Sequence, residues 1–183
     1  MARHITGYYG FGGGSLDGEA LENALRTDAH LPIESVEYAA TGGGIYTTGP
    51  RNLVVGTEMA AIVDQDAGGN YDTAVGLGYG LLNVGYSVKL GPFRVIPLIG
   101  FGGGGLGLDI TPIASGNAPD LSELRVSRSN FLVHIGLGIE LRIGGRFGLV
   151  VGGQAGYVLA PFSGRAGIRG PYFRLMFGGN GRV

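Results

Sequence analysis

The sequence contains no cysteine, so disulfide bonds and thiolate metal sites are excluded. Charged residues make up only 15% of the chain and its net charge is −1, so it offers no basic field with which to hold nucleic acid. No run of about 18 uninterrupted apolar residues occurs, which excludes a transmembrane helix. A transmembrane strand needs only about 9 to 11 alternating residues, so strands remain the one route across a bilayer.

Glycine is abundant, with 39 residues in a chain of 183. The glycines recur inside alternating strand patterns, without the Gly-X-Y period of collagen and without the polar tracts of disordered chains. The length suits a single closed sheet. We therefore expect residues 1–183 to form one all-β domain.

The most regular strand pattern lies at residues 131–143, where every odd position is a large apolar residue. The even positions hold leucine, histidine, two glycines, glutamate and arginine. A soluble sheet would cover its second face with lysine, glutamate and threonine, whereas this second face is small and polar. We therefore expect the apolar face to point outward, into lipid or against a partner. The outward positions expected here and in the following strand are Phe131, Val133, Ile135, Leu137, Ile139, Leu141, Ile143, Phe147, Leu149 and Val151.

The same period of two predicts eight strands along the chain. Three of their connections are tight turns rich in glycine and proline, and these alternate with four longer connections. Such alternation places all tight turns and both termini at one end of an antiparallel up-and-down barrel of the transmembrane type. The expected strands cover residues 4–12, 35–47, 52–63, 71–90, 93–110, 131–143, 146–159 and 171–177.

Three local features interrupt this regular pattern. Asp17 is a suitable N-cap for a short helix over residues 17–26, in the first long loop. Within strand 71–90 the apolar phase changes at Leu81 and Leu82, which predicts a bulge. Pro97 falls inside a strand of a closed barrel, so it predicts a second bulge or a different register.

The interior of an eight-stranded barrel is barely wide enough for side chains. Inward positions should therefore be small, and we expect Gly76, Gly78 and Gly80 among them. Charges that face such a lumen must be paired, and carboxylates opposite guanidinium groups would plug it. The residues expected in this polar network are Glu37, Glu58, Lys89, Arg94, His134, Glu140, Arg142, Gln154 and Arg174.

His134 and Glu140 are the one pair that suggests acid-base catalysis. Six residues span about 20 Å along a strand, which is too far for a hydrogen bond. A lipid A deacylase of the small-barrel type would bring a His-x-Ser pair, whereas Gly136 stands where the serine would be. Residues 100–105 fit a G-x-G-x-x-G pattern, but a strand pattern follows instead of a helix. We therefore predict no enzymatic activity and no cofactor.

Residues 64–72 carry carboxylates and an amide with a spacing that superficially resembles a calcium loop. The twelfth position of that loop, which requires a bidentate acid, is Val75, and strand patterns flank the segment. We expect a solvated hairpin without a metal. Calcium held by these oxygen ligands is the minor alternative, and its candidate residues are Asp64, Asp66, Asn70 and Asp72.

The pattern as a whole resembles small eight-stranded bacterial outer-membrane barrels of the OmpA-like or OmpX-like kind. The resemblance is carried by Val-Gly-Leu-Gly-Tyr-Gly at 75–80, by Gly-Gln-Ala-Gly-Tyr at 153–157 and by Phe-Arg-Leu-Met-Phe at 173–177. The last segment is similar to an outer-membrane assembly signal. The resemblance implies an outer-membrane location, the lipid bilayer as partner, and a structural role with loops available for adhesion or assembly. It carries over no functional residue.

Two alternatives stay open at this point. Residues 1–5 lack the basic and apolar profile of a signal peptide, so a location without export is retained as an expectation. In the first alternative, copies of the chain or another protein cover the apolar belt as a homo-oligomer or protein assembly. In the second, the faces are reversed and the chain is a soluble calyx that binds a lipid.

Overall fold

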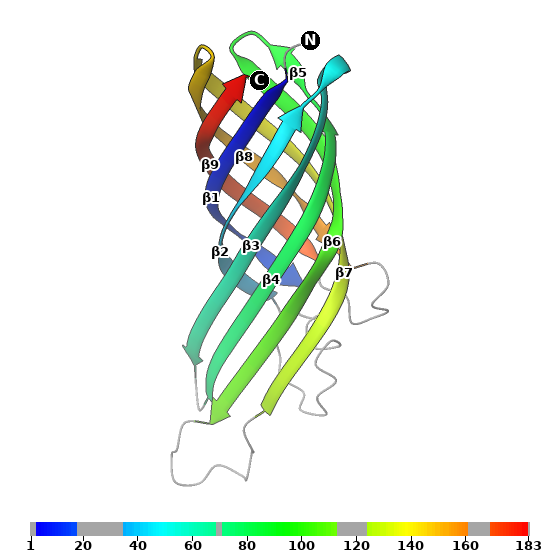
Figure 1. The fold of residues 1–183 in the computed structure, drawn as a ribbon. Helices are drawn as coiled ribbons and strands as arrows, with labels where there is room; N and C mark the ends of the chain where they lie inside the picture. Colours follow the sequence, from blue (N-terminus) through cyan, green and yellow to red (C-terminus); the bar gives the residue numbers. More distant parts are fainter. Residues whose placement is uncertain (1–2, 18–34, 69–70, 113–123, 161–168, 183) are drawn as a thin grey trace.

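A computed structural model describes residues 3–17, 35–68, 71–112, 124–160 and 169–182. In these residues nearly every position belongs to one antiparallel β-sheet that closes on itself (Figure 1). The strands are β1 (His4–Asp17), β2 (Ser35–Thr48), β3 (Leu53–Gly68), β4 (Tyr71–Tyr86), β5 (Val88–Leu90), β6 (Phe93–Pro112), β7 (Leu124–Gly144), β8 (Phe147–Leu159) and β9 (Gly170–Arg182).

The barrel closes between its first and last strands, because β1 pairs with β9 as well as with β2. Strands β4 and β5 together form one stave. Both pair with β6 in the same register, and the stave is interrupted only at Ser87. The predicted eight-stranded up-and-down barrel is therefore confirmed.

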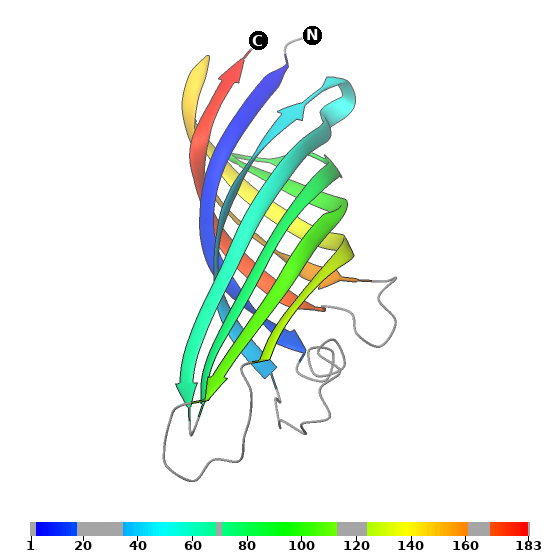
Figure 2. The same ribbon diagram turned by 60° about the horizontal axis from the view of Figure 1, so that its bottom comes forward.

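The two ends of the barrel differ. Both termini and β5 lie at one end, while β3, β4, β6 and β7 extend past the other strands at the opposite end (Figures 1 and 2). We call these the turn end and the loop end. Strands β6 and β7 have 20 and 21 residues, whereas β8 and β9 have 13 each. One side of the wall is therefore taller than the other.

Two connections predicted as long loops, residues 64–70 and 111–130, contain more strand than expected. The β3–β4 ladder continues to the pair Gly68 and Tyr71, and β7 begins at Leu124 rather than at residue 131. Backbone groups in a hairpin can satisfy one another beyond the apolar belt, so the ladder does not need to end where the alternating apolar pattern ends. At the turn end, Gly91 and Gly144 adopt φ angles of +61° and +116°, which glycine accepts without a steric penalty.

The bulge predicted at Leu81 and Leu82 is wrong, because β4 keeps one phase throughout its ladder with β6. Leu77 and Leu81 face the lumen and are each 4% exposed. Gly76 and Gly78 face outward, where an added Cβ would meet no atom within 4 Å. Two adjacent leucines fit either phase, and glycine fits an open face as well as a crowded one, so the sequence pattern could not assign the faces here.

The bulge predicted at Pro97 is also absent from the described ladders. Pro97 pairs with Leu137 of β7 in an unbroken register, and its side chain is exposed on the outside. A proline has no backbone N–H to donate. The neighbouring stave is interrupted at Ser87, whose backbone N–H donates instead to the Asn52 carbonyl at 2.9 Å.

The helix predicted over residues 17–26 lies outside the described residues, apart from its N-cap Asp17. The one helical element in the described ranges is a 3-10 turn at Pro50–Asn52, between β2 and β3. No described helix is long and apolar enough to cross a membrane.

The outer wall is apolar and the interior is mixed. The odd positions from 131 to 143 of β7 point outward, while Leu132, His134 and Glu140 between them are buried. This orientation is the reverse of what the soluble calyx requires, so that alternative is wrong. The expected outward residues that are exposed are Phe131, Ile135, Leu137, Ile139, Ile143, Phe147, Leu149 and Val151, and those that are half-buried are Val133 and Leu141.

Candidate functional site

The lumen is crossed by a layer of polar side chains, all of them buried except the half-buried Tyr8, and we call it the central layer. Its members come from β1, β3, β4, β7, β8 and β9 and are Tyr8, Glu58, Asn83, His134, Gln154, Tyr172 and Arg174.

An ion pair between β3 and β9 is the centre of this layer. Arg174 Nη2 lies 2.6 Å from Glu58 Oε2, and the two residues are 6% and 2% exposed. The Asn83 amide donates to the same carboxylate oxygen at 2.7 Å. The Tyr8 ring lies 5.4 Å from the Arg174 guanidinium carbon. Both charges are removed from water, so each depends on the other for its stability.

Further hydrogen bonds of the central layer form a chain from Arg174 to His134. Arg174 Nε donates to Gln154 Oε1 at 3.0 Å, which turns the Gln154 amide nitrogen toward the Tyr172 hydroxyl, also at 3.0 Å. The Tyr172 hydroxyl accepts that bond and is then free to donate to His134 Nε2, with which it is in contact. A neutral His134 ring would therefore carry its proton on Nδ1.

Gly100 occupies the gap between the two ends of this chain of contacts. It pairs with Asn83 on one side and with His134 on the other. A Cβ at position 100 would collide with Asn83 Oδ1 and would lie 3.2 Å from His134 Nδ1. Both of these atoms are buried and have no hydrogen-bond partner among the described residues. Position 100 therefore requires glycine, because side chains from both neighbouring strands fill the space.

A second polar group lies closer to the turn end, and we call it the mouth layer. It consists of Tyr46, Glu140 and Arg142. Arg142 donates from Nε and Nη2 to Glu140 Oε1, each at 2.7 Å, and the Tyr46 hydroxyl donates to Glu140 Oε2. Both oxygens of this buried carboxylate are therefore engaged.

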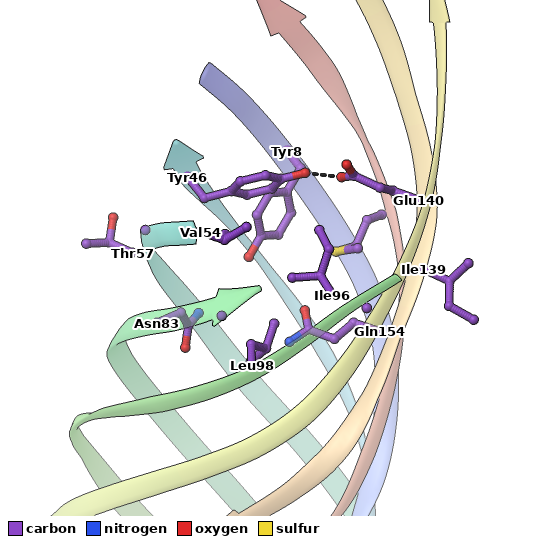
Figure 3. Close-up of a pocket in the computed structure, with 14 residues that line it drawn as sticks. Tyr8, Tyr46, Val54, Thr57, Asn83, Ile96, Leu98, Ile139, Glu140 and Gln154 are labelled. Carbon is purple, nitrogen blue, oxygen red and sulfur yellow. Dashed lines mark hydrogen bonds between the residues drawn. The ribbon is translucent and has the colours of Figure 1, made fainter. Parts of the chain in front are cut away.

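A cavity of about 40 Å³ lies between the two layers (Figure 3). Tyr46 and Glu140 border it toward the turn end, and Asn83 and Gln154 border it on the other side. Its walls are mostly apolar and contain no nucleophile with an adjacent base. A smaller cavity on the far side of Arg174 is also bordered by Tyr172, so the central layer separates two internal spaces. The apolar side chains of the larger cavity are Val54, Ile96, Leu98 and Met176.

Six of the nine residues predicted for the lumen network lie in these two layers. Glu58, His134, Gln154 and Arg174 belong to the central layer, and Glu140 and Arg142 to the mouth layer.

The other three lie elsewhere. Arg94 is half-buried and Lys89 is exposed, both near the turn end. Glu37 is exposed among the outward positions of β2 and takes no part in the network, contrary to expectation. Its neighbour Tyr38 takes the inward position.

Sequence reasoning missed Asn83 and three tyrosines, Tyr8, Tyr46 and Tyr172. A tyrosine ring fits an apolar pattern, although its hydroxyl needs a hydrogen-bond partner when it is buried. Each tyrosine stands two positions from a glycine on the same strand face, and this spacing was the signal in the sequence for an inward position.

The two residues considered for catalysis are not brought together. His134 and Glu140 belong to different layers and share no hydrogen bond. Among the described residues there is no group of three or more His, Cys, Asp or Glu that could hold a metal ion. Asp64 and Asp66 occupy positions opposite Val75 and Thr73, Asp72 lies on the paired strand, and Asn70 is outside the described residues.

Comparisons with known proteins place the fold. No protein-family model matches the chain, and no curated protein matches its sequence. Among solved structures, the attachment invasion locus protein Ail of Yersinia pestis is similar, with a TM-score of 0.58, 11% identity and full coverage of both chains.

Two further structures agree. A major outer membrane protein of Thermus thermophilus has a TM-score of 0.54 at 11% identity, covering 98% of this chain and 99% of that one. Neisserial surface protein A has a TM-score of 0.52 at 10% identity, covering 98% and 97%. The chain therefore has the fold of an outer-membrane β-barrel.

Proposed function

We propose that this chain is a structural, non-enzymatic barrel of an outer membrane, with a lumen plugged by the central layer and with loops available for adhesion or assembly. The observation that carries the proposal is the combination of a closed sheet, an apolar outer wall and a charged pair buried across the lumen. The fold of the three similar structures supports the membrane location.

The outer wall favours lipid as its environment. Large apolar side chains are exposed on every stave, and the most exposed of them, Phe147, has 76% of its surface accessible. Soluble monomers rarely expose apolar patches of more than a few hundred Å². A closed barrel leaves no strand edge unpaired, which is the condition for a sheet to cross a bilayer. An apolar wall on a closed sheet is therefore best explained by a bilayer around it.

The central layer supports a plugged lumen. Glu58 and Arg174 join strands that are not neighbours in the wall, so their ion pair passes through the interior. Glu58 also accepts from Asn83, and Arg174 also donates to Gln154, so side chains fill the space around the pair. An ion path along the axis would have to break these contacts.

Recordings in planar bilayers test the plug. The purified chain should insert without giving steady single-channel steps. Clear, stable steps from the unmodified protein would contradict a closed lumen. A porin inserted under the same conditions serves as the positive control.

Adhesion is the role proposed for the loops at the loop end. The name of the similar Ail protein refers to attachment and invasion. Cells that display this chain should attach to host-cell monolayers more than cells that display a version with residues 18–34 and 113–123 replaced by Gly-Ser linkers. Equal attachment, with equal surface amounts of both proteins, would leave assembly as the role of the loops.

A further inference from the structure

The turn end of the barrel carries a strong excess of positive charge. Among the described residues from the mouth layer to the turn end, Glu140 is the one acidic residue. The basic side chains in the same region are Arg3, His4, Arg51, Lys89, Arg94, Arg142, Arg146 and Arg182. The net charge of the whole chain is only −1, because the other 13 of its 14 acidic residues lie outside this region.

Five of these residues share the inward face, and we call them the mouth ring: His4, Lys89, Arg94, Arg142 and Arg182. Each is two positions from a buried lumen residue on its own stave, and residues two apart in a strand lie on one face. The corresponding buried residues are Thr6, Ser87, Ile96, Glu140 and Asn180.

The register brings the members of the mouth ring together. Lys89 pairs with Arg94, and His4 pairs with Arg182. Arg94 also pairs with Glu140, which lies two residues from Arg142 on the same face of β7. The ring therefore joins β1, β5, β6, β7 and β9 around one opening.

The mouth ring has hydrogen-bond donors to spare. The Arg142 side chain is 10% exposed, and its Nη1 is buried without a hydrogen-bond partner among the described residues. His4 Nδ1 is buried and unpartnered in the same sense, and it is a donor when that nitrogen carries the proton. Glu140 balances only one of these positive charges, and Arg142 and Tyr46 already engage both of its oxygens. Within the described ranges, Lys89, Arg94 and Arg182 make no ion pair.

We propose that the mouth ring binds a soluble phosphate-bearing anion that enters along the barrel axis from the turn end. Guanidinium groups bind phosphate oxygens through paired, charge-assisted hydrogen bonds, and several of them around one point favour a multiply charged anion. The ring faces the lumen, whereas membrane lipids surround the outer wall. Cations placed to meet lipid head groups are the exposed Arg51 and Arg146, at the turns. The proposal does not depend on the plug or on the role of the loops.

Titration of the full-length protein in a zwitterionic detergent with inorganic pyrophosphate tests the proposal. Calorimetry should give saturable binding that weakens as salt is added. The double variant Arg94→Gln/Arg182→Gln should weaken binding roughly tenfold or more, because it removes two charge-assisted donors. The matched control Arg51→Gln/Arg146→Gln removes the same charge outside the ring and should change the affinity by no more than about threefold.

Two results would overturn the mouth ring as the site. One is the absence of saturable binding. The other is an equal loss in both double variants, which would indicate only a general attraction to a basic surface. Thermal unfolding of both variants, followed by circular dichroism, shows whether the barrel is intact, and Arg94→Lys/Arg182→Lys should recover part of the affinity if a variant with glutamine fails to fold.

A second arm distinguishes a soluble anion from a lipid head group. Wild type and the two double variants are placed in nanodiscs that contain phosphatidylglycerol, and the lipid retained after extraction is measured. Equal retention by wild type and Arg94→Gln/Arg182→Gln supports a soluble ligand. Loss of retained phosphatidylglycerol from that variant alone would assign the ring to lipid and contradict the proposal.

Discussion

The central layer and the mouth ring use the same kinds of residue to opposite effect. In the central layer a single cation, Arg174, meets a single carboxylate, Glu58, and both are almost fully buried. In the mouth ring several cations surround one carboxylate that is already engaged. A buried pair that balances its charge contributes to holding the wall together, whereas an unbalanced ring close to water is suited to binding. Charge balance and depth therefore separate the structural site from the binding site in this barrel.

The largest effect is expected from breaking the balance of the central layer. Arg174→Met leaves Glu58 as a buried charge without a partner, which should lower the free energy of unfolding by about 3–5 kcal/mol. Urea unfolding in lipid vesicles measures this change. Arg146→Met, at an exposed turn position, removes the same charge and should cost less than about 0.5 kcal/mol.

Adding Glu58→Gln to Arg174→Met should restore part of the lost stability, because the uncompensated charge is then removed. If the loss of stability in the double variant equals the sum of the losses in the two single variants, the two residues act independently. That result would contradict the contact of 2.6 Å between them.

A smaller effect is expected from filling the gap in the central layer. Gly100→Ala places a methyl group against Asn83 and His134 and should cost about 1–3 kcal/mol through overpacking. Gly78→Ala is the matched control, because an added Cβ there meets nothing within 4 Å. Vesicle unfolding of both variants should separate them clearly, and equal costs would mean that the inward and outward faces of this region are assigned incorrectly.

The smallest effect concerns the one acidic residue of the mouth layer. Glu140→Gln frees two donors of Arg142 and should tighten pyrophosphate binding roughly threefold to tenfold. Calorimetry measures this effect beside Glu37→Gln, an exposed carboxylate on the outside of β2, which should leave the affinity unchanged. Weaker binding by Glu140→Gln would show that Glu140 orients the ring instead of neutralising it.

The comparison of β7 with β4 shows how far the sequence could be read. Over residues 131–143 of β7 the odd positions are all large and apolar, so only one orientation places them together, and the structure has that orientation. In β4 glycines alternate with leucine and tyrosine, and both phases are compatible with such a pattern. The strand order and the closure followed from connection lengths, whereas the face of β4 depends on how neighbouring side chains fill the lumen.

The candidate site was predictable only in part for the same reason. Glu58 and Arg174 are charges within apolar strands, so pairing across the lumen was the one way to bury them. Which carboxylate meets which guanidinium depends on the strand register, which the sequence pattern leaves open. The tyrosine hydroxyls join the network only because their rings reach the interior at the right height.

The measurement that most directly tests the central claim is the environment of the outward face of β7 in a bilayer. The chain contains no cysteine, so Ile135→Cys and Ile139→Cys each provide a single site for a nitroxide spin label. In vesicles, both labels should be highly accessible to oxygen and poorly accessible to a water-soluble nickel reagent, as expected for side chains in lipid. Low accessibility to both reagents would show that protein covers this face, and high accessibility to nickel would show that water does, so either result would contradict a barrel whose apolar wall faces the membrane.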